Sequence, residues 1–147
     1  MAPRNGQRFV LLVDDEEIVI RSFGNVLAAH PNYLLDVALT VADGVAKLNL
    51  FSYHVVILDL KFDNDVHAGL AVLRELNRLI RKSQHEWRGV LTTRVIIMSS
   101  HIDLGLLQNE APHVVPLEFI PKPVSFDEAF VERVLRRIGL NEGTRNE

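Results

Sequence analysis

Several short apolar runs in this sequence each end at polar side chains, and this pattern constrains the possible fold more than any other feature. The clearest run, residues 55–58, contains four apolar residues and ends directly at Asp59. A continuous apolar run of this length is typical of a strand that is buried on both faces, as in a parallel sheet. A carboxylate is costly to bury in such an interior, so the chain should reach the surface at Asp59. Three further runs end in the same way: 9–13 before Asp14 and Asp15, 95–98 before Ser99 and Ser100, and 117–120 before Pro121-Lys122-Pro123.

Helical patterns separate the apolar runs. Strands are predicted at 9–13, 33–39, 53–58, 94–98 and after Pro116, and each is followed by apolar residues at helical spacing. Thr40 is a predicted N-cap, and Ser125 with Glu128 has the spacing of a capping box. The inward-facing stripes of the third and fifth helices are predicted as Leu70, Leu73, Leu76 and Ile80, and as Phe126, Phe130, Val134 and Ile138. A short helix is expected over 103–111, and polar connectors over 61–69 and, with the only tryptophan, Trp87, over 82–92.

This alternation predicts an α/β fold, a doubly wound five-stranded parallel sheet with helices on both faces. Pro121 has no N–H to give to a neighbouring strand, so the fifth strand should lie at an edge of the sheet. Parallel strands also share one carboxyl edge, where ligands of open α/β sheets bind. The three carboxylates, a serine hydroxyl and the ammonium of Lys122 should therefore gather at that edge.

Composition narrows the function. The chain has 147 residues, 48% of them hydrophobic, which suits one domain with a proper core. It has no cysteine, so a disulfide framework and thiolate metal ligands are excluded. A net charge of −3 argues against direct nucleic-acid binding, and no run approaches the roughly 20 apolar residues of a membrane span. No apolar signal-peptide core is present near the first residue, so a cytoplasmic protein is expected.

The gathered side chains indicate a particular chemistry. Carboxylates that lie close together repel one another unless a cation lies between them, and Mg²⁺ prefers such oxygen ligands. A carboxylate can also act as a nucleophile and form an aspartyl phosphate. Lys122 would offset charge on a transferring phosphoryl group, and the Ser99 hydroxyl can donate to one of its oxygens.

The sequence resembles the receiver domain of two-component response regulators. The resemblance is carried by polar residues that follow the predicted strands in this order along the chain: Asp14-Asp15, Asp59, Ser99 and Lys122-Pro123. The resemblance covers residues 8–139 and leaves 140–147 as a polar tail. It implies a flavodoxin-like (βα)5 fold with strand order 2-1-3-4-5. It implies that Asp59 accepts the phosphoryl group and that Ser99 and Lys122 bind it. Mg²⁺ would be held by Asp14, Asp15, Asp59 and the backbone carbonyl of Lys61, Phe119 would be the switch aromatic, and the Lys122–Pro123 peptide is expected to be cis.

The resemblance also implies partners. The expected phosphodonor is a sensor histidine kinase or a phosphotransfer protein, and the expected target is a downstream effector or a fused output domain. Direct binding to nucleic acid or a membrane is not expected, whereas a homodimer is compatible with the resemblance. The domain is expected to be a switch rather than an enzyme.

Three departures from the family pattern keep alternatives open. The loop after Asp59 has no proline, and Gly69 follows Asp59 by ten residues instead of the usual eight. Ser100 stands where the family prefers a small apolar residue, so either Ser99 or Ser100 could supply the switch hydroxyl. One alternative function is a pseudo-receiver interaction module that is never phosphorylated. Another is a Mg²⁺-dependent phosphohydrolase, against which Lys61 counts, because such enzymes often carry an acidic group two residues after the nucleophile.

Overall fold

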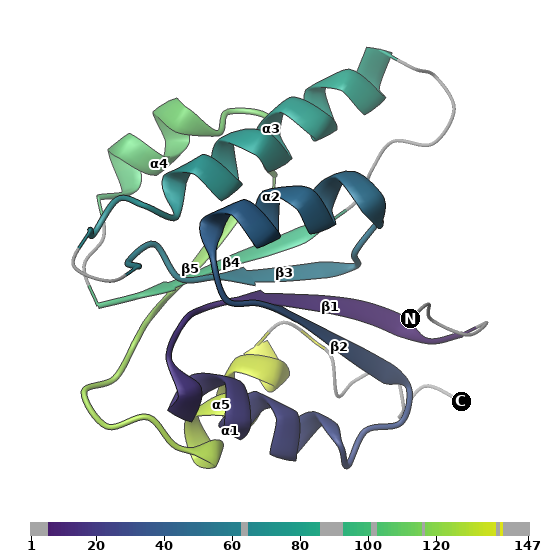
Figure 1. Ribbon diagram of the computed structural model, residues 1–147, viewed down its shortest axis with the longest axis vertical. Coiled ribbons are helices and arrows are strands. Elements are labelled where there is room, and N and C mark those ends of the chain that lie inside the picture. Colours follow the sequence, from purple (N-terminus) through teal and green to yellow (C-terminus); the bar gives the residue numbers. More distant parts are fainter. Residues whose placement is uncertain are drawn as a thin grey trace.

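The alternating pattern of the sequence is present in the structure, a computed structural model that describes residues 6–62, 65–85, 93–100, 103–115, 117–137 and 139 (Figure 1). The strands are β1 (Arg8–Val13), β2 (Tyr33–Ala38), β3 (Val55–Leu58), β4 (Arg94–Ser99) and β5 (Leu117–Pro121). The helices are α1 (Glu17–Leu27), α2 (Val41–Leu50), α3 (Leu70–His85), α4 (Leu104–Glu110) and α5 (Glu128–Arg137). Strand and helix alternate from β1 to α5, as predicted.

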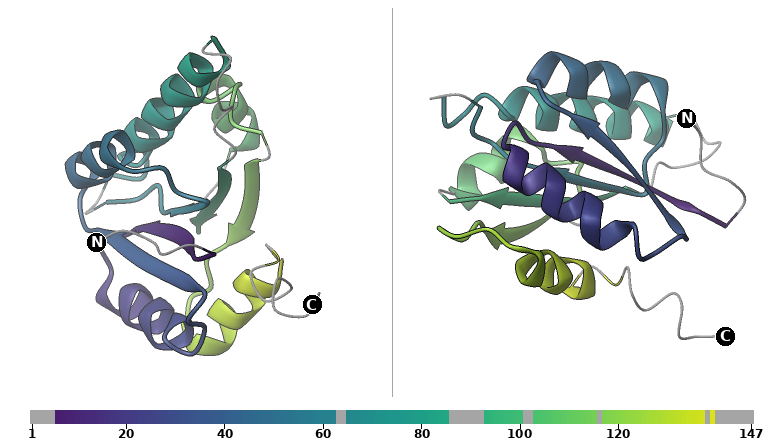
Figure 2. Two further views of the ribbon diagram at one scale, coloured as in Figure 1. Left: turned by 90° about the vertical axis from the view of Figure 1, so that its right-hand side faces the viewer. Right: turned by 60° about the horizontal axis from the view of Figure 1, so that its bottom comes forward.

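All strand pairs are parallel, and the sheet order is β2-β1-β3-β4-β5. The predicted order is therefore confirmed, as is the edge position of the strand that contains Pro121. Helices α2, α3 and α4 cover one face of the sheet, and α1 and α5 cover the other (Figure 1). In both views of Figure 2 the sheet lies between these two helix layers, so its central strands are shielded on both sides. Each layer encloses its own apolar core, and the residues of β1, β3 and β4 contribute alternately to one core and the other.

One polar residue inside a strand has a packing explanation. Asp36 of β2 is buried, and its carboxylate accepts hydrogen bonds from the Tyr53 hydroxyl at 2.7 Å and the Lys47 ammonium at 3.0 Å. Burial alone would raise the pKa of Asp36, but these hydrogen bonds lower it overall. The interrupted apolar pattern of this strand thus marks a partly buried ion pair between β2 and α2.

Two helix boundaries differ from the prediction. Helix α3 runs to His85, although a connector was predicted from residue 82, because arginine, lysine and glutamine extend a helix well without an apolar stripe. The predicted capping box at the start of α5 is wrong: Ser125 lies before the helix, and the Asp127 side chain accepts the hydrogen bond from the Phe130 amide at 2.9 Å. The buried face of α5 consists of Phe130, Val131, Val134 and Leu135. Ile138, Trp87 and residues 140–147 lie outside the described residues.

None of the described helices combines the length and apolar character that a membrane crossing requires.

Candidate functional site

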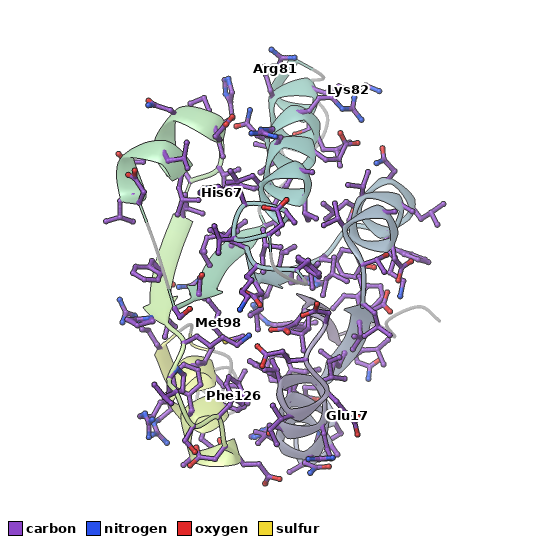
Figure 3. All side chains as sticks on the ribbon, turned by 60° about the vertical axis from the view of Figure 1, so that its left-hand side comes forward. Glu17, His67, Arg81, Lys82, Met98 and Phe126 are labelled. Carbon is purple, nitrogen blue, oxygen red and sulfur yellow. The ribbon has the colours of Figure 1, made fainter. Side chains whose placement is uncertain are left out.

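The carboxyl edge of the sheet brings together side chains that are up to 108 residues apart in the sequence. The Lys122 ammonium, directly after β5, donates to Asp14 at 3.1 Å and to Asp59 at 3.0 Å. Asp14 and Asp59 directly follow β1 and β3, which are neighbours in the sheet, and the lysine side chain reaches them across the end of β4. Figure 3 brings this edge forward, with His67 above it and Phe126 and Glu17 below. The predicted gathering is thus present for Asp14, Asp59 and Lys122.

Backbone hydrogen bonds fix the positions of both buried carboxylates. The Asp14 amide donates to Ala38 at 3.1 Å, and the Asp59 amide donates to Val13 at 3.0 Å, so the ladders of the sheet continue one residue past the strands. The Asp14 carboxylate also accepts from the Glu16 amide at 2.8 Å, and the Asp59 carboxylate from the Lys61 amide at 3.2 Å. These bonds leave little freedom to either side chain, which is what a site for directed chemistry requires.

Asp14, Asp15 and Asp59 form a cluster whose ligand atoms all lie within 4.8 Å of one another. Asp14 and Asp59 are buried, whereas Asp15 is exposed. The expectation that the chain reaches the surface at Asp59 is therefore wrong, because the Lys122 ammonium and the Lys61 amide serve as its polar partners inside the protein. Burial raises the pKa of Asp14 to about 6 and also raises that of Asp59, even though the neighbouring Lys122 ammonium opposes both changes. The Lys122 ammonium therefore does not offset the cost of burying both carboxylates in their charged form, and a hard divalent cation fits this all-oxygen donor set.

The electrostatic partner of the cluster is Lys122. Its side chain is only 9% exposed, and burial alone would lower its pKa. The surrounding carboxylates of Asp14, Glu16 and Asp59 raise the pKa instead, so the ammonium stays charged. A permanent positive charge beside Asp59 suits the binding of a phosphoryl group.

Glu16 belongs to this site, although its sequence pattern does not distinguish it from an ordinary helix-start residue. Its carboxylate accepts from Lys122 at 2.5 Å, the shortest of the three lysine contacts. Glu16 occupies the N-cap position of α1, but its side chain makes no capping hydrogen bond. In the sequence Glu16 is part of an acidic run at a helix start, where capping is the ordinary interpretation. No local signal separates it from Glu17, because its partner lies 106 residues away.

Ser99 and Ser100 differ in their surroundings. Ser99 is the last residue of β4 and is buried, and its carbonyl accepts from the Lys122 amide at 3.0 Å. Ser100 is exposed and lines a small hollow of about 250 Å³ together with Asp59, Lys61 and Lys122. Both serines thus lie at the site, and the role of Ser99 as the switch hydroxyl stays a prediction.

The loop after Asp59 is anchored at both ends. Phe62 is buried, and its backbone pairs with that of Asp65 through two hydrogen bonds of 3.1 and 3.0 Å. At the far end, the Gly69 amide donates to the Leu60 carbonyl at 2.7 Å. A Cβ at Gly69 would lie 2.4 Å from the Asp59 carbonyl oxygen, a distance that no side chain tolerates. Glycine at this position therefore allows the loop to close on the backbone that carries the central carboxylate.

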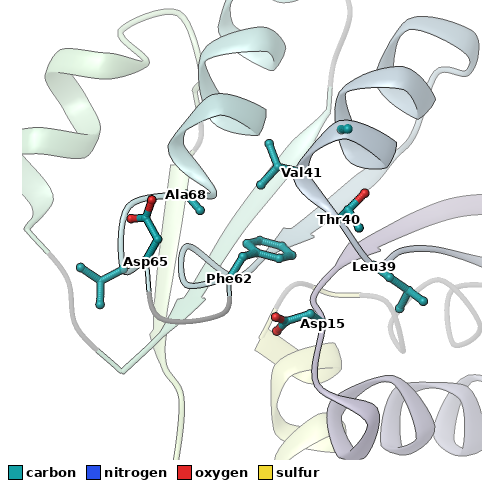
Figure 4. Close-up of a pocket in the computed structure, with 9 residues that line it drawn as sticks. Asp15, Leu39, Thr40, Val41, Phe62, Asp65 and Ala68 are labelled. Carbon is teal, nitrogen blue, oxygen red and sulfur yellow. The ribbon is translucent and has the colours of Figure 1, made fainter.

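A larger hollow of about 1000 Å³ lies beside the cluster (Figure 4). Asp15 lines it from the end of β1, Thr40 and Val41 from the start of α2, and Phe62 and Asp65 from the loop after β3. Because Asp15 also belongs to the acidic cluster, the hollow gives solvent direct access to that side of the site.

Phe119 lies on β5 in register with Ile97 and is half-buried against the core between the sheet and α2–α4. Its proposed role as a switch residue stays a prediction.

Comparison with known proteins identifies the class to which this fold and site belong. A family model described as the response regulator receiver domain matches residues 10–134. The chain therefore belongs to the response regulator receiver domain family, the phosphorelay modules of two-component systems. Members of this family are generally phospho-accepting switches rather than conventional enzymes. They interact with histidine kinases or phosphotransfer proteins, and output domains are often fused to them.

Solved structures share the fold at low sequence identity. The receiver domain of Francisella response regulator 1452 is 17% identical, with a TM-score of 0.63 over 91% of this chain and 95% of that one. The response regulator domain of Thermotoga maritima CheB is 21% identical, with a TM-score of 0.63 over 92% of both chains. A CheY-like receiver domain from Methanospirillum hungatei JF-1 is 18% identical, with a TM-score of 0.64 over 94% of this chain and 98% of that one. No curated protein matches the chain in sequence.

Proposed function

We propose that this protein is a phosphorylation-controlled switch that accepts a phosphoryl group on Asp59 in a Mg²⁺-dependent reaction. The observation that carries the proposal is the contact between the buried Asp59 carboxylate and the Lys122 ammonium, within the cluster that includes Asp14 and Asp15. A carboxylate that is oriented by hydrogen bonds and faced by a fixed positive charge can attack phosphorus and be stabilised as charge moves onto the phosphoryl oxygens.

Each residue of the site has a separate role in the phosphoryl transfer. An Asp59 oxygen forms a bond to phosphorus while the bond between phosphorus and the leaving group breaks, and the leaving group departs with the bonding electrons. Lys122 donates to a phosphoryl oxygen, and a serine hydroxyl at the end of β4, Ser99 in our prediction, donates to another. Asp14, Asp15, Asp59 and the Lys61 carbonyl would hold Mg²⁺, which supplies positive charge to the transferring phosphoryl group.

The proposal extends to the partners. A sensor histidine kinase or a phosphotransfer protein would supply the phosphoryl group, and a downstream effector or fused output domain would respond to it. The response would be a population shift in which the serine and Phe119 rearrange once Asp59 is phosphorylated. We place the protein in the cytoplasm, where such kinases present their phosphohistidine.

The test is incubation with acetyl phosphate and Mg²⁺, followed by intact-mass measurement and peptide mapping. We expect one hydroxylamine-sensitive phosphoryl group on Asp59, lost in EDTA and in Asp59→Asn. Asp65→Asn is the matched control, since it makes the same change in the same loop and should still be phosphorylated. The absence of phosphate on Asp59 in a folded protein would refute the proposal and favour a pseudo-receiver, whereas steady hydrolysis of a phosphomonoester would favour a phosphohydrolase.

The two serines are separated by a second comparison under the same conditions. Ser99→Ala should slow phosphorylation of Asp59 and Ser100→Ala should not, if the buried serine supplies the hydroxyl. The reverse order would assign the switch hydroxyl to Ser100.

A further inference from the structure

The ammonium of Lys122 has no donor to spare in the unphosphorylated protein. An ammonium carries three N–H donors. In the structure it contacts three carboxylates: Glu16 at 2.5 Å, Asp59 at 3.0 Å and Asp14 at 3.1 Å. A phosphoryl group that arrives at Asp59 can therefore be bound by Lys122 only after one of these contacts is released.

The three carboxylates differ in how easily they can release the lysine. The Asp14 side chain is fully buried and is held by the Glu16 amide, so its departure would leave a charge unsolvated. Asp59 is the proposed acceptor and stays in place. The Glu16 side chain is 54% exposed and has no role in capping α1, so water can replace the lysine at little cost. Of the three carboxylates, that of Glu16 can thus release Lys122 most easily.

Glu16 also lies on the approach to Asp59. The small hollow that leads to Asp59 is lined by Glu16, Lys61 and Lys122 among others. A small phosphodonor that enters this hollow is an anion, and the Glu16 carboxylate repels it while occupying the lysine that would attract it.

We propose that Glu16 is a positioning residue that holds Lys122 as a counter-ion in the resting protein and thereby slows phosphorylation of Asp59 by anionic donors. This inference rests on the proposed function. Glu16 would limit the rate of Asp59 phosphorylation until its side chain turns toward solvent and the Lys122 ammonium binds the phosphoryl group instead.

The test compares Glu16→Gln with Glu17→Gln at saturating Mg²⁺, with acetyl phosphate as the donor. Both variants remove one negative charge from the same turn, but the Glu17 side chain is 88% exposed and pairs with Arg21 instead of Lys122. We expect Glu16→Gln to raise the rate constant for phosphorylation roughly threefold to tenfold at low ionic strength, the range for removing one like charge several ångströms from a dianion in a water-rich site. Glu17→Gln should match the wild type.

Ionic strength separates this mechanism from a structural effect. Screening weakens the interactions of a half-exposed charge, so the advantage of Glu16→Gln should shrink as salt is raised toward about 1 M, where the Debye length is about 3 Å. Urea unfolding should show that the folded fraction of both variants is unchanged under assay conditions. A Glu16→Gln rate equal to or below that of the wild type, or a rate advantage that salt does not change, would overturn the inference.

The Lys122 ammonium itself gives a readout that does not depend on phosphorylation. In protein labelled with ¹⁵N-lysine, Glu16→Gln should speed hydrogen exchange at the Lys122 Nζ, and Glu17→Gln should not. If no variant is phosphorylated but this change is seen, the proposed function fails while the counter-ion contact stands. If the wild type is phosphorylated but Glu16→Gln alters neither the exchange nor the rate, only the inference about Glu16 fails.

Discussion

The acidic cluster should destabilise the fold that carries it, and Asp14 offers the clearest measurement. Its side chain is fully buried, and burial raises its pKa to about 6 from the usual 3.8. Since the folded-state pKa lies above the unfolded one, protonation favours the folded protein. The resulting stability is fully present below pH 3.8 and is lost as the pH rises through about 6.

The size of the effect follows from the same two values. A difference of about two pH units corresponds to about 3 kcal/mol, at about 1.4 kcal/mol per unit. Replacing Asp14 by asparagine removes this penalty. The amide oxygen of asparagine can still accept from the Glu16 amide, and Lys122 keeps its contacts with Glu16 and Asp59. We therefore expect Asp14→Asn to raise the free energy of unfolding by up to about 3 kcal/mol near neutral pH.

The assay is urea unfolding in EDTA at several pH values between about 4 and 7.5, with linear extrapolation to water. The gain in Asp14→Asn should be largest at the upper end and should shrink as the pH falls toward 3.8. Asp127→Asn is the matched control, because it makes the same change at an exposed helix cap where asparagine caps equally well. It should leave stability nearly unchanged at every pH.

The same unfolding measurement is then repeated with added Mg²⁺. A cation that binds only the folded protein stabilises it by about 2.7 kcal/mol at 100 times its dissociation constant. Added Mg²⁺ should therefore narrow the gap between wild type and Asp14→Asn, because the wild type has the more complete ligand set. An Asp14→Asn protein that is no more stable than the wild type near neutral pH in EDTA, or a gap that does not depend on pH, would refute the reasoning.

Two further predictions concern the support of the site and of the sheet. Gly69→Ala should destabilise the protein by more than about 2 kcal/mol in urea unfolding, since its Cβ would meet the Asp59 backbone. The control Gly24→Ala, in open space within α1, should stabilise the protein by up to about 1 kcal/mol. Equal effects of the two substitutions would contradict the close approach at Gly69. Tyr53→Phe should cost about 1–3 kcal/mol near neutral pH by removing a buried donor to Asp36. Burial raises the pKa of Asp36 but its hydrogen bonds lower it overall, so the cost should decrease as the pH falls below the usual 3.8, and a cost independent of pH would contradict this assignment.

The part of the site that could be predicted from the sequence consists of charged residues that follow apolar runs. Asp14 and Asp59 directly follow apolar runs, and Lys122 follows one after Pro121. A charged group ends such a run because it needs polar partners, which the apolar space between two helix layers does not supply. Parallel strands then place all three at one edge, and the ion pairs at 3.0 and 3.1 Å agree with that expectation. The order of the strands, in contrast, followed from the family resemblance, since apolar runs alone do not specify which strands are neighbours.

Two features were not predictable from local patterns, because the sequence offers equivalent candidates for each. Asp127, rather than Ser125, caps α5, although both are good capping residues two positions apart. The same holds for Glu16, whose neighbour Glu17 has the same side chain and whose role is decided by Lys122. For Glu16 the choice is made by the tertiary structure, which brings Lys122 to it from 106 residues away.

The loop after Asp59 departs from the family pattern, and its described residues keep contacts with the backbone around Asp59. Gly69 lies two residues later than the family's glycine, yet its amide bonds to the Leu60 carbonyl and its Cα packs against the Asp59 backbone. The added length is taken up between these contacts, where Phe62 pairs with Asp65 and is anchored in the core. The Lys61 amide consequently still donates to the Asp59 carboxylate at 3.2 Å. Phe62 and Asp65 of this loop line the larger hollow together with Asp15, so the loop can alter access to the acidic cluster while the contact between Asp59 and Lys122 is preserved.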